Sequence, residues 1–274
     1  MNNPLQKYFR QPKIFIKLPS GGIYNQPGTI QGDPDHMPVY GMTGMDEIII
    51  KTPDSLLTGE STATIVSSCC PSIKNSWDIS NIDLPLIMAA IRIATYGPAM
   101  DVGHTCDNCQ AHNEYEILLN QVIEYYMNVK FDNVLVLGDL VVKLRPLNYK
   151  ESTEVSIKNF KLQQQIVQVE QIEDADRRQE LLNQLFIELA KINNEIYKMV
   201  VESVEIDNQV VTERRFIEEW IDNCEKQVFD RVREHNKRNA DTFAMPLFPV
   251  KCDSCGTEVK LSIDLDQSSF FVQA

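Results

Sequence analysis

The sequence HTCDNCQ, residues 104–110, contains a Cys-x-x-Cys pair, and VKCDSCGTEV, residues 250–259, contains a second pair with the same spacing. Each pair is followed by a stretch that can form a strand. A tetrahedral zinc ion binds four thiolates, and each Cys-x-x-Cys turn supplies two of them while its backbone N–H groups stabilise the sulfur charge. We therefore expect one structural zinc site made by Cys106, Cys109, Cys252 and Cys255.

The two pairs are far apart in the chain. Residues 110–251, 142 in all, separate them, whereas a compact zinc ribbon has roughly 15–20 residues there. The logarithmic law of loop closure makes the extra length cost about 2 kcal/mol, which is small beside the roughly 10–16 kcal/mol of apparent zinc binding. The intervening residues can therefore fold as an insertion that the metal holds at its base.

Other uses of the cysteines remain open. A thioredoxin-like redox pair begins a helix, and neither pair here precedes a helical pattern. A hydrolytic zinc needs an open position and usually His or carboxylate ligands, and His104 or His112 could replace one cysteine. Metal-free thiols are a further alternative. We expect Cys69, Cys70 and Cys224 to pack in the core or at an interface, as small apolar side chains do.

The composition points to a folded protein whose partners are proteins. Of 274 residues, 43% are apolar and 24% are charged, and the net charge of −13 repels phosphate backbones and anionic membranes. No run of about eighteen apolar residues and no signal-peptide pattern is found, so we expect a cytoplasmic location with reduced thiols. We expect neither nucleic acid nor membrane as a partner, and self-association is left open.

The first region, residues 1–145, is predicted to be an α/β domain that carries the first cysteine pair. Its alternating segment KIFIKL, residues 13–18, predicts a strand. Residues 52–70 predict two short helices, the first starting at Thr52 and Pro53, with a break at Gly59.

The clearest helix of this region is DLPLIMAAIRIATYGP, residues 83–98. Asp83 is the expected N-cap, and Gly97 with Pro98 ends the helix. Because apolar residues cover most of its surface, we expect a central core helix. Alternation on both sides of Gly138 and Asp139 predicts a β-hairpin.

The second region, residues 146–203, is predicted to form a helical hairpin arm. Apolar residues from Leu182 onward recur with a spacing of 3, 4, 3, 4 and 3, which defines a heptad seam made by Leu182, Leu185, Leu189, Ile192, Ile196 and Met199. A shorter seam of Val155, Leu162, Ile166 and Val169 precedes an acidic turn at residues 173–176. The two seams either pack on each other or pack on the body of the domain.

The third region, residues 204–274, is predicted to contain helices and the second cysteine pair. A small hairpin is expected around Asp207 and Asn208, followed by helices at 212–224, with Thr212 as the N-cap, and at 225–239. Strands are expected on both sides of Cys252 and Cys255. The predicted fold is α+β and mostly helical, with an N-terminal α/β region, a long helical hairpin insertion, and a zinc-ribbon-like β element closed by two distant knuckles.

Residue patterns of common enzymes are missing from the sequence. It has no Gly-rich phosphate loop, no nucleophile elbow and no His-Glu-x-x-His motif. Trp77 and Trp220 are expected to be core or interface residues without a chemical role. We therefore expect no enzymatic activity.

An ordered set of motifs resembles the baseplate hub protein family of contractile-tailed, T-even-type bacteriophages. The motifs are LPSGGIY (18–24), MPVYGMTGMDEIIIKTPDSLLTGE (37–60), SCCPSIKNSWDISNIDLPLIMAAIRIATYG (68–97), CDNC (106–109) and the terminal VKCDSCG with SSFF. The segment 46–97 is the specific part, because Cys-x-x-Cys pairs alone occur in many unrelated proteins.

The resemblance implies a component of the central baseplate hub, or a factor that assembles it, made in the cytoplasm of the infected cell. Its expected partners are other hub and tail proteins. The competing interpretation is a zinc-ribbon adaptor that binds nucleic acid or transcription machinery. Such an adaptor needs a basic face, which the charge of −13 disfavours.

Overall fold

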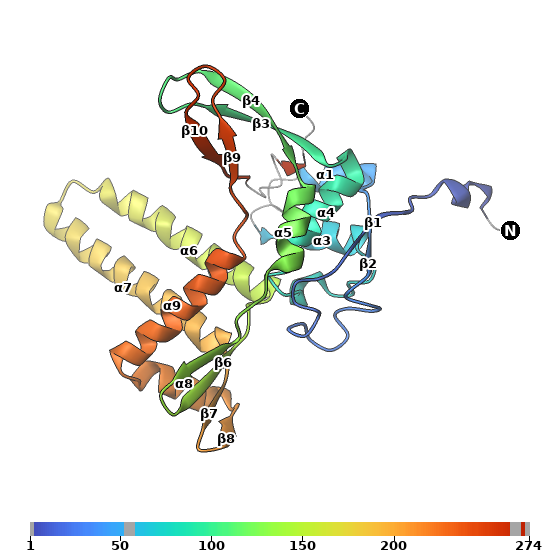
Figure 1. Ribbon diagram of the computed structural model, residues 1–274. Helices are drawn as coiled ribbons and strands as arrows, with labels where there is room; N and C mark the ends of the chain where they lie inside the picture. The colour runs from blue at the N-terminus through green and yellow to red at the C-terminus, as the bar shows by residue number, and fades with distance from the viewer. Residues whose placement is uncertain (1–2, 52–57, 264–269, 272–274) are drawn as a thin grey trace. The chain divides into compact units, whose positions relative to one another are not determined.

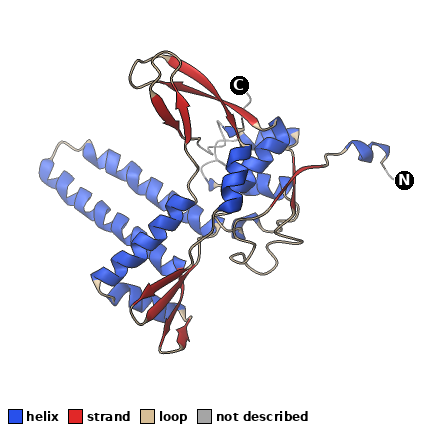
Figure 2. Cartoon of the chain, in the orientation of Figure 1, coloured by secondary structure: helices blue, strands red, loops and turns tan. Residues whose placement is uncertain are grey.

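The computed structural model describes residues 3–51, 58–263 and 270–271. The helix start expected at Thr52 and Pro53 lies outside these residues. By their contacts, the residues up to 130 and from 243 onward form unit 1, and residues 131–242 form unit 2. Each unit combines helices with small antiparallel sheets (Figure 1 and Figure 2), which confirms the predicted α+β class.

A two-stranded sheet and a set of helices make the body of unit 1. Strand β1 (Pro12–Ile16), which covers most of the expected strand, pairs with β2 (Met37–Tyr40) and contacts α4. The helices are η1 (Pro4–Tyr8), α1 (Gly44–Ile50), α3 (Glu60–Cys69), η2 (Ser76–Asp78), α4 (Leu84–Tyr96) and α5 (Asn120–Asn128). Helix α3 begins after Gly59, which has a left-handed φ of 78°. The sequence did not lead us to expect helices α1 and α5.

Helix α4 is the core helix of unit 1, as its apolar sequence predicts. All residues from Leu86 to Arg92 are buried, and Gly97 ends the helix with a φ of 96°. Asp83 is the N-cap residue of α4, as predicted, but its carboxylate makes no capping hydrogen bond to the helix. It accepts instead from the backbone N–H of Ser20 at 2.8 Å and from the Ser20 hydroxyl at 2.5 Å. A loop 63 residues earlier in the chain therefore competes successfully for this side chain.

Two β-hairpins complete unit 1 and carry the cysteine pairs. Strand β3 (Ala99–Thr105) pairs with β4 (His112–Leu118), and Cys106 and Cys109 lie in the turn between them. Strand β9 (Phe248–Lys251) pairs with β10 (Glu258–Leu261), and Cys252 and Cys255 lie in that turn. The expected strands around the second pair are thus present.

Unit 2 is built on a four-stranded antiparallel sheet with the order β5-β6-β7-β8. Its strands are β5 (Val134–Leu137), β6 (Leu140–Leu144), β7 (Val201–Ile206) and β8 (Gln209–Val211). The predicted hairpin at Gly138 joins β5 to β6, and the one at Asp207 and Asn208 joins β7 to β8. Both Asp207 and Asn208 have positive φ, which suits the right-handed twist of a short hairpin.

The helices of unit 2 are α6 (Tyr149–Glu170), α7 (Ala175–Val200), α8 (Arg214–Asn223) and α9 (Lys226–Thr242). Helices α7, α8 and α9 contact the sheet, and α6 packs on α7. The buried core joins sheet and helices through Leu135, Val142, Leu144, Val200, Val201, Val204, Ile217, Ile221 and Val232. Trp220 packs against this core, as expected. None of the helices in the described ranges combines the length and apolar composition needed to cross a bilayer.

Helices α6 and α7 form an antiparallel hairpin and pack against each other (Figure 1). Leu162 on α6 is buried, and the α7 seam from Leu182 to Met199 is half-buried. Other apolar side chains of the hairpin face solvent, among them Phe160, Val167, Phe186 and Ile187. The hairpin therefore has one packed seam and several apolar residues outside it.

Side chains define where these helices begin. Asn148 and Glu151 make a capping box at the start of α6, and Asp174 caps α7. The predicted N-cap Thr212 of α8 is wrong, because the N-cap is Glu213 and it makes no side-chain cap hydrogen bond. Arg214 instead donates to the backbone carbonyl of Val201 and fixes the helix start to the sheet.

The two ends of unit 2 are tied to each other. His235 Nε2 donates to the carbonyl of Asp132 at 2.7 Å, while Asn239 accepts from the Asp132 N–H at 3.0 Å and donates to its carbonyl at 2.8 Å. On the unit 1 side, the hydroxyl of Tyr126 donates to the carbonyl of Phe243 at 3.2 Å. Within unit 2, the first residues of the unit are therefore hydrogen-bonded to its last helix. Within unit 1, the helix that precedes unit 2 is hydrogen-bonded to the first residue that follows it.

The regions 1–145, 146–203 and 204–274 remain a prediction about domain boundaries. Hairpin β5–β6 ends before residue 145, yet its second strand, β6, pairs with β7. It belongs for that reason to the same sheet as strands that follow the long helices.

Candidate metal centre

The two cysteine turns have the same backbone structure. In the first, the N–H of Cys106 donates to the carbonyl of Ala111 and the N–H of Gln110 donates to the carbonyl of Cys106. In the second, Cys252 donates to Thr257 and Gly256 donates to Cys252, at matching positions. The residue after each second cysteine has a positive φ, 58° at Gln110 and 71° at Gly256. Two distant segments thus fold into equivalent knuckles.

The four sulfur atoms of these knuckles lie together. Each is within 4.8 Å of the others, with Cys106 Sγ 3.8 Å from Cys255 Sγ and Cys109 Sγ 3.6 Å from Cys252 Sγ. Cys106 and Cys252 are buried, and Cys109 and Cys255 are exposed. The structure therefore brings together all four cysteines predicted to share one site.

The spacing of the sulfur atoms suits a tetrahedral metal ion. Zn–S bonds of about 2.3 Å in a tetrahedron place sulfur atoms about 3.8 Å apart. The Cys109–Cys252 and Cys106–Cys255 distances of 3.6 and 3.8 Å agree with that value. Four thiolates leave no open coordination position, so the arrangement is typical of a structural zinc site and not of a catalytic one.

Amide side chains from the first knuckle reach the cysteines of the second. Asn113 is only 5% exposed, and its Nδ2 lies 3.5 Å from Cys252 Sγ while its Oδ1 accepts from the Asp253 N–H at 3.2 Å. Asn108 Nδ2 lies 3.7 Å from Cys255 Sγ and 3.2 Å from the Thr257 hydroxyl oxygen. Hydrogen bonds of this kind orient metal ligands and stabilise their charge.

These supporting residues were not predictable from the sequence. Asn108 lies inside a Cys-x-x-Cys turn, where any residue type fits the motif. Asn113 is one position of an alternating strand, and its partners at 252 and 253 are 139 or more residues away. The alternation of β4 does place Asn113 on the inner face, but it does not identify the thiol that the amide contacts.

The protonation of the thiols depends on their hydrogen bonds. The side-chain and backbone hydrogen bonds with Thr257, together with that from Asn108, lower the pKa of Cys255 to about 6. At Cys109, the backbone N–H of Ala111 favours the thiolate, but the neighbouring sulfur of Cys255 and the other two cysteines outweigh it and raise its pKa to about 12. The hydrogen bonds at Cys255 thus favour its thiolate, the sulfur neighbours of Cys109 disfavour a second one, and a divalent cation bound by all four sulfur atoms would release the remaining protons.

The alternative ligands and reactions gain no support from the geometry. Among the described residues, the His, Cys, Asp and Glu side chains that cluster at ligand distance are the four cysteines, without His104 or His112. Each pair leads into a strand and not into a helix, unlike a thioredoxin-type redox pair.

The other three cysteines do not belong to this cluster. Cys69 and Cys70 are buried in unit 1, and burial raises the pKa of Cys69 to about 12. Cys224 is half-buried in unit 2, and burial raises its pKa too. Burial and a raised pKa keep these thiols neutral and therefore weakly nucleophilic. This agrees with the expectation that they are packing residues.

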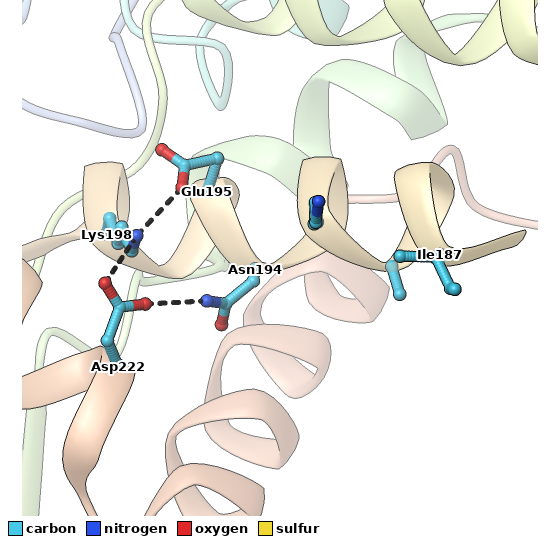
Figure 3. Close-up of a pocket in the computed structure, with 7 residues that line it drawn as sticks. Ile187, Asn194, Glu195, Lys198 and Asp222 are labelled. Carbon is cyan, nitrogen blue, oxygen red and sulfur yellow. Dashed lines mark hydrogen bonds and ion pairs between the residues drawn. The ribbon is translucent and has the colours of Figure 1, made fainter. Parts of the chain in front are cut away.

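An open groove of about 380 Å³ lies on unit 2, between α7 and the end of α8 (Figure 3). Ile187 and Ala190 give it an apolar part, and Lys198 binds Glu195 at 2.9 Å and Asp222 at 2.8 Å at its other end. Asn194 also donates to Asp222 at 3.1 Å. The charged groups satisfy one another, so the groove offers a surface for contact and no arrangement for catalysis.

Comparison with known proteins identifies the family. The model of the T4 bacteriophage base plate protein family matches residues 42–272. The chain belongs to this family. The matched range contains both cysteine knuckles and the whole of unit 2. No curated protein and no solved structure matches the chain.

Membership of the base plate protein family confirms the resemblance to T-even-type phage baseplate proteins. A structural or assembly role in the phage tail follows for the chain at this level. Such families are generally non-enzymatic, in keeping with a thiolate site that has no open coordination position.

Proposed function

We propose that this base plate family protein is a structural or assembly component of the baseplate hub and that one zinc ion, bound by Cys106, Cys109, Cys252 and Cys255, holds unit 1 together. The observation that carries the proposal is the family match over residues 42–272, which includes both knuckles. The four sulfur atoms within 4.8 Å of one another support the metal.

The metal acts as a clip in this proposal. Its ligands come from the two sequence segments of unit 1, one before and one after unit 2. When bound, zinc supplies coordination energy and no reaction chemistry. The β3–β4 and β9–β10 hairpins are then locked together, and the ends of the long insertion are kept at one place.

In this proposal, two surfaces of the chain contact other hub and tail proteins. The first is the body of unit 1, which carries most of the residues that resemble hub proteins. The second is the α6–α7 hairpin, whose exposed Phe160, Val167, Phe186 and Ile187 are 49–58% accessible to solvent. Apolar side chains at such exposure are typical of interaction surfaces when they gather on one element.

A direct test measures metal content and assembly separately. The protein purified from cells grown with zinc should contain one zinc per chain, and Cys252→Ser/Cys255→Ser should contain none. In infected cells supplied with either protein, co-purification with hub and tail proteins should follow the intact protein only. Tight, salt-sensitive binding to duplex DNA, with no association with tail proteins, would favour the nucleic-acid adaptor instead.

A further inference from the structure

The segment of residues 3–9 lies at the surface of unit 1 without covering any core. Every residue of it is exposed, including Leu5 at 60%, Tyr8 at 73% and Phe9 at 56%. Its hydrogen bonds are local, from Leu5 N–H to Asn3, from Gln6 to Asn3 and from Phe9 to Gln6. In Figure 1 this segment, with η1, extends beyond β1 and away from the helices of the unit.

The root of this segment is fixed to the body of unit 1. The Arg10 guanidinium donates to the carbonyls of Gly41 at 2.9 Å and Ser68 at 2.6 Å, and lies 3.5 Å from the Asp46 carboxylate. Residues 3–9 are therefore presented from a rigid base. Three large apolar side chains held in water on such a base suggest a surface that becomes covered.

The charge of the segment is opposite to that of the rest of the chain. Residues 3–9 contain Lys7 and no acidic residue, whereas the whole chain has a net charge of −13. A basic apolar peptide is attracted to an acidic protein surface. The surface of another copy of this chain has that character.

A complementary face lies next to the root. Helix α1 exposes Met45 at 65% and Ile48 at 62%, three residues apart on one side of the helix. Glu47 lies between them in sequence, its side chain is half-exposed, and it forms an ion pair on the surface with Lys51 at 3.0 Å. Asp46, which binds Arg10, belongs to the same short helix.

We propose that residues 3–9 dock on helix α1 of a second copy of this chain, with Leu5, Tyr8 and Phe9 covering Met45 and Ile48 and Lys7 facing Glu47. Because the segment and the receiving helix are neighbours on one surface, the same contact forms twice around a twofold axis. Each copy then receives the segment of the other copy, so the interface is isologous and assembly stops at a dimer.

The test uses the full chain in sedimentation equilibrium between about 1 and 100 μM, a range that spans typical weak dimers. We expect a reversible dimer whose dissociation constant rises severalfold when the salt concentration increases, because part of the attraction is between charges. Tyr8→Ser/Phe9→Ser and Met45→Ser/Ile48→Ser should each raise that constant at least tenfold. Zinc content and the circular dichroism spectrum should not change, since these side chains are exposed.

A matched control and a direct contact measurement complete the test. Phe160→Ser removes an aromatic ring of similar exposure from α6 and should leave the dimer intact. A photo-crosslinker at position 8, in a mixture of labelled and unlabelled copies, should join the segment to α1 of the other copy. A monomer throughout the concentration range, a dimer that survives both double substitutions, or a crosslink only within one copy would overturn the proposal.

Discussion

Asn113 is the residue that joins the two knuckles most directly. Asn113→Leu keeps the size of the side chain but removes the N–H near Cys252 and the acceptor used by Asp253. We expect zinc affinity to fall about 10–100-fold, as is typical when a group that orients metal ligands is lost. Competition with a chromophoric chelator measures this.

The control for this prediction is Asn223→Leu on unit 2. Asn223 is exposed and donates only to the Glu219 carbonyl one helical turn away. The Asn223→Leu variant should bind zinc with the same affinity as the unchanged protein. Equal affinity in the Asn113 and Asn223 variants would show that the amide has no part in holding the site.

Asp83 makes the stability of unit 1 depend on pH. Burial raises its pKa to about 6, although hydrogen bonds from Ser20 favour the carboxylate. The folded state therefore keeps the Asp83 proton to higher pH than the unfolded state does. Its stabilising contribution is fully present below about pH 4 and is lost as pH rises through about 6.

Asp83→Asn tests this dependence, because the amide can retain the hydrogen bonds with Ser20. The free energy of unfolding of the unchanged protein, relative to the variant, should fall by up to about 3 kcal/mol between pH 4 and pH 7. Denaturant unfolding at several pH values gives both curves, and contributions of other groups cancel in their difference. Parallel curves would contradict the assignment.

At the scale of elements, the α6–α7 hairpin depends on its half-buried seam. Leu189→Asp/Ile192→Asp places two carboxylates in that seam and should lower the free energy of unfolding of unit 2 by about 2–4 kcal/mol, because a buried charge without a partner is costly. Association with hub proteins should weaken as well. The zinc content should not change, since no ligand lies in unit 2.

Exposed neighbours on the same helix provide the comparison. Phe186→Asp/Ile187→Asp changes side chains that are 52% and 58% exposed, so unfolding should shift by less than about 0.5 kcal/mol. Loss of association in this variant alone would assign the partner surface to the exposed side of α7. A seam variant as stable as the unchanged protein would contradict the packed seam.

Elements with a strong local signal were predictable, and those set by distant contacts were not. The repeat of α7 and the turns at Gly138 and Asp207 follow from residues close in sequence. Helix α1 was not predicted, because the three consecutive isoleucines at its end, residues 48–50, have no periodicity that distinguishes a short helix from a strand. Asp83 is at the predicted N-cap position, but the partner of its carboxylate, Ser20, could not be predicted because it is 63 residues away.

At the scale of the whole molecule, the metal and unit 2 should behave independently. The core of unit 2 contains none of the four cysteine ligands. A strong chelator should therefore lower the thermal midpoint of unit 1 while most of the helical signal of α6 to α9 persists. Hydrogen exchange resolved by peptide can follow both units in one sample.

Cysteine substitutions complete this prediction. Cys252→Ser/Cys255→Ser should match the chelated protein, whereas Cys224→Ser, in unit 2, should keep its zinc and respond to the chelator as the unchanged protein does. A single cooperative transition that includes unit 2 in every sample would contradict independent units. It would mean that the metal stabilises the insertion as well.

The grouping of the four cysteines was predictable because zinc chemistry restricts candidate ligands to a few residue types and spacings. Zinc binding by these cysteines stays a prediction. Sulfur positions, the pairing of β6 with β7 and the contacts of Asn108 and Asn113 depend on chain segments that meet only after folding. Sequence spacing carries no information about them. The four clustered cysteines could therefore be named from the sequence, whereas the groups that contact them could not.

The separation of the two knuckles also gives synthesis of this protein a definite order. A ribosome adding about 5–20 residues per second needs roughly 7–28 s to make the 142 residues between Cys109 and Cys252. Unit 2 emerges in that interval, while the first knuckle waits with two unligated thiols. A nascent chain that stops before Cys255 lacks a complete second knuckle, so the four thiols can meet only on polypeptides translated past that residue.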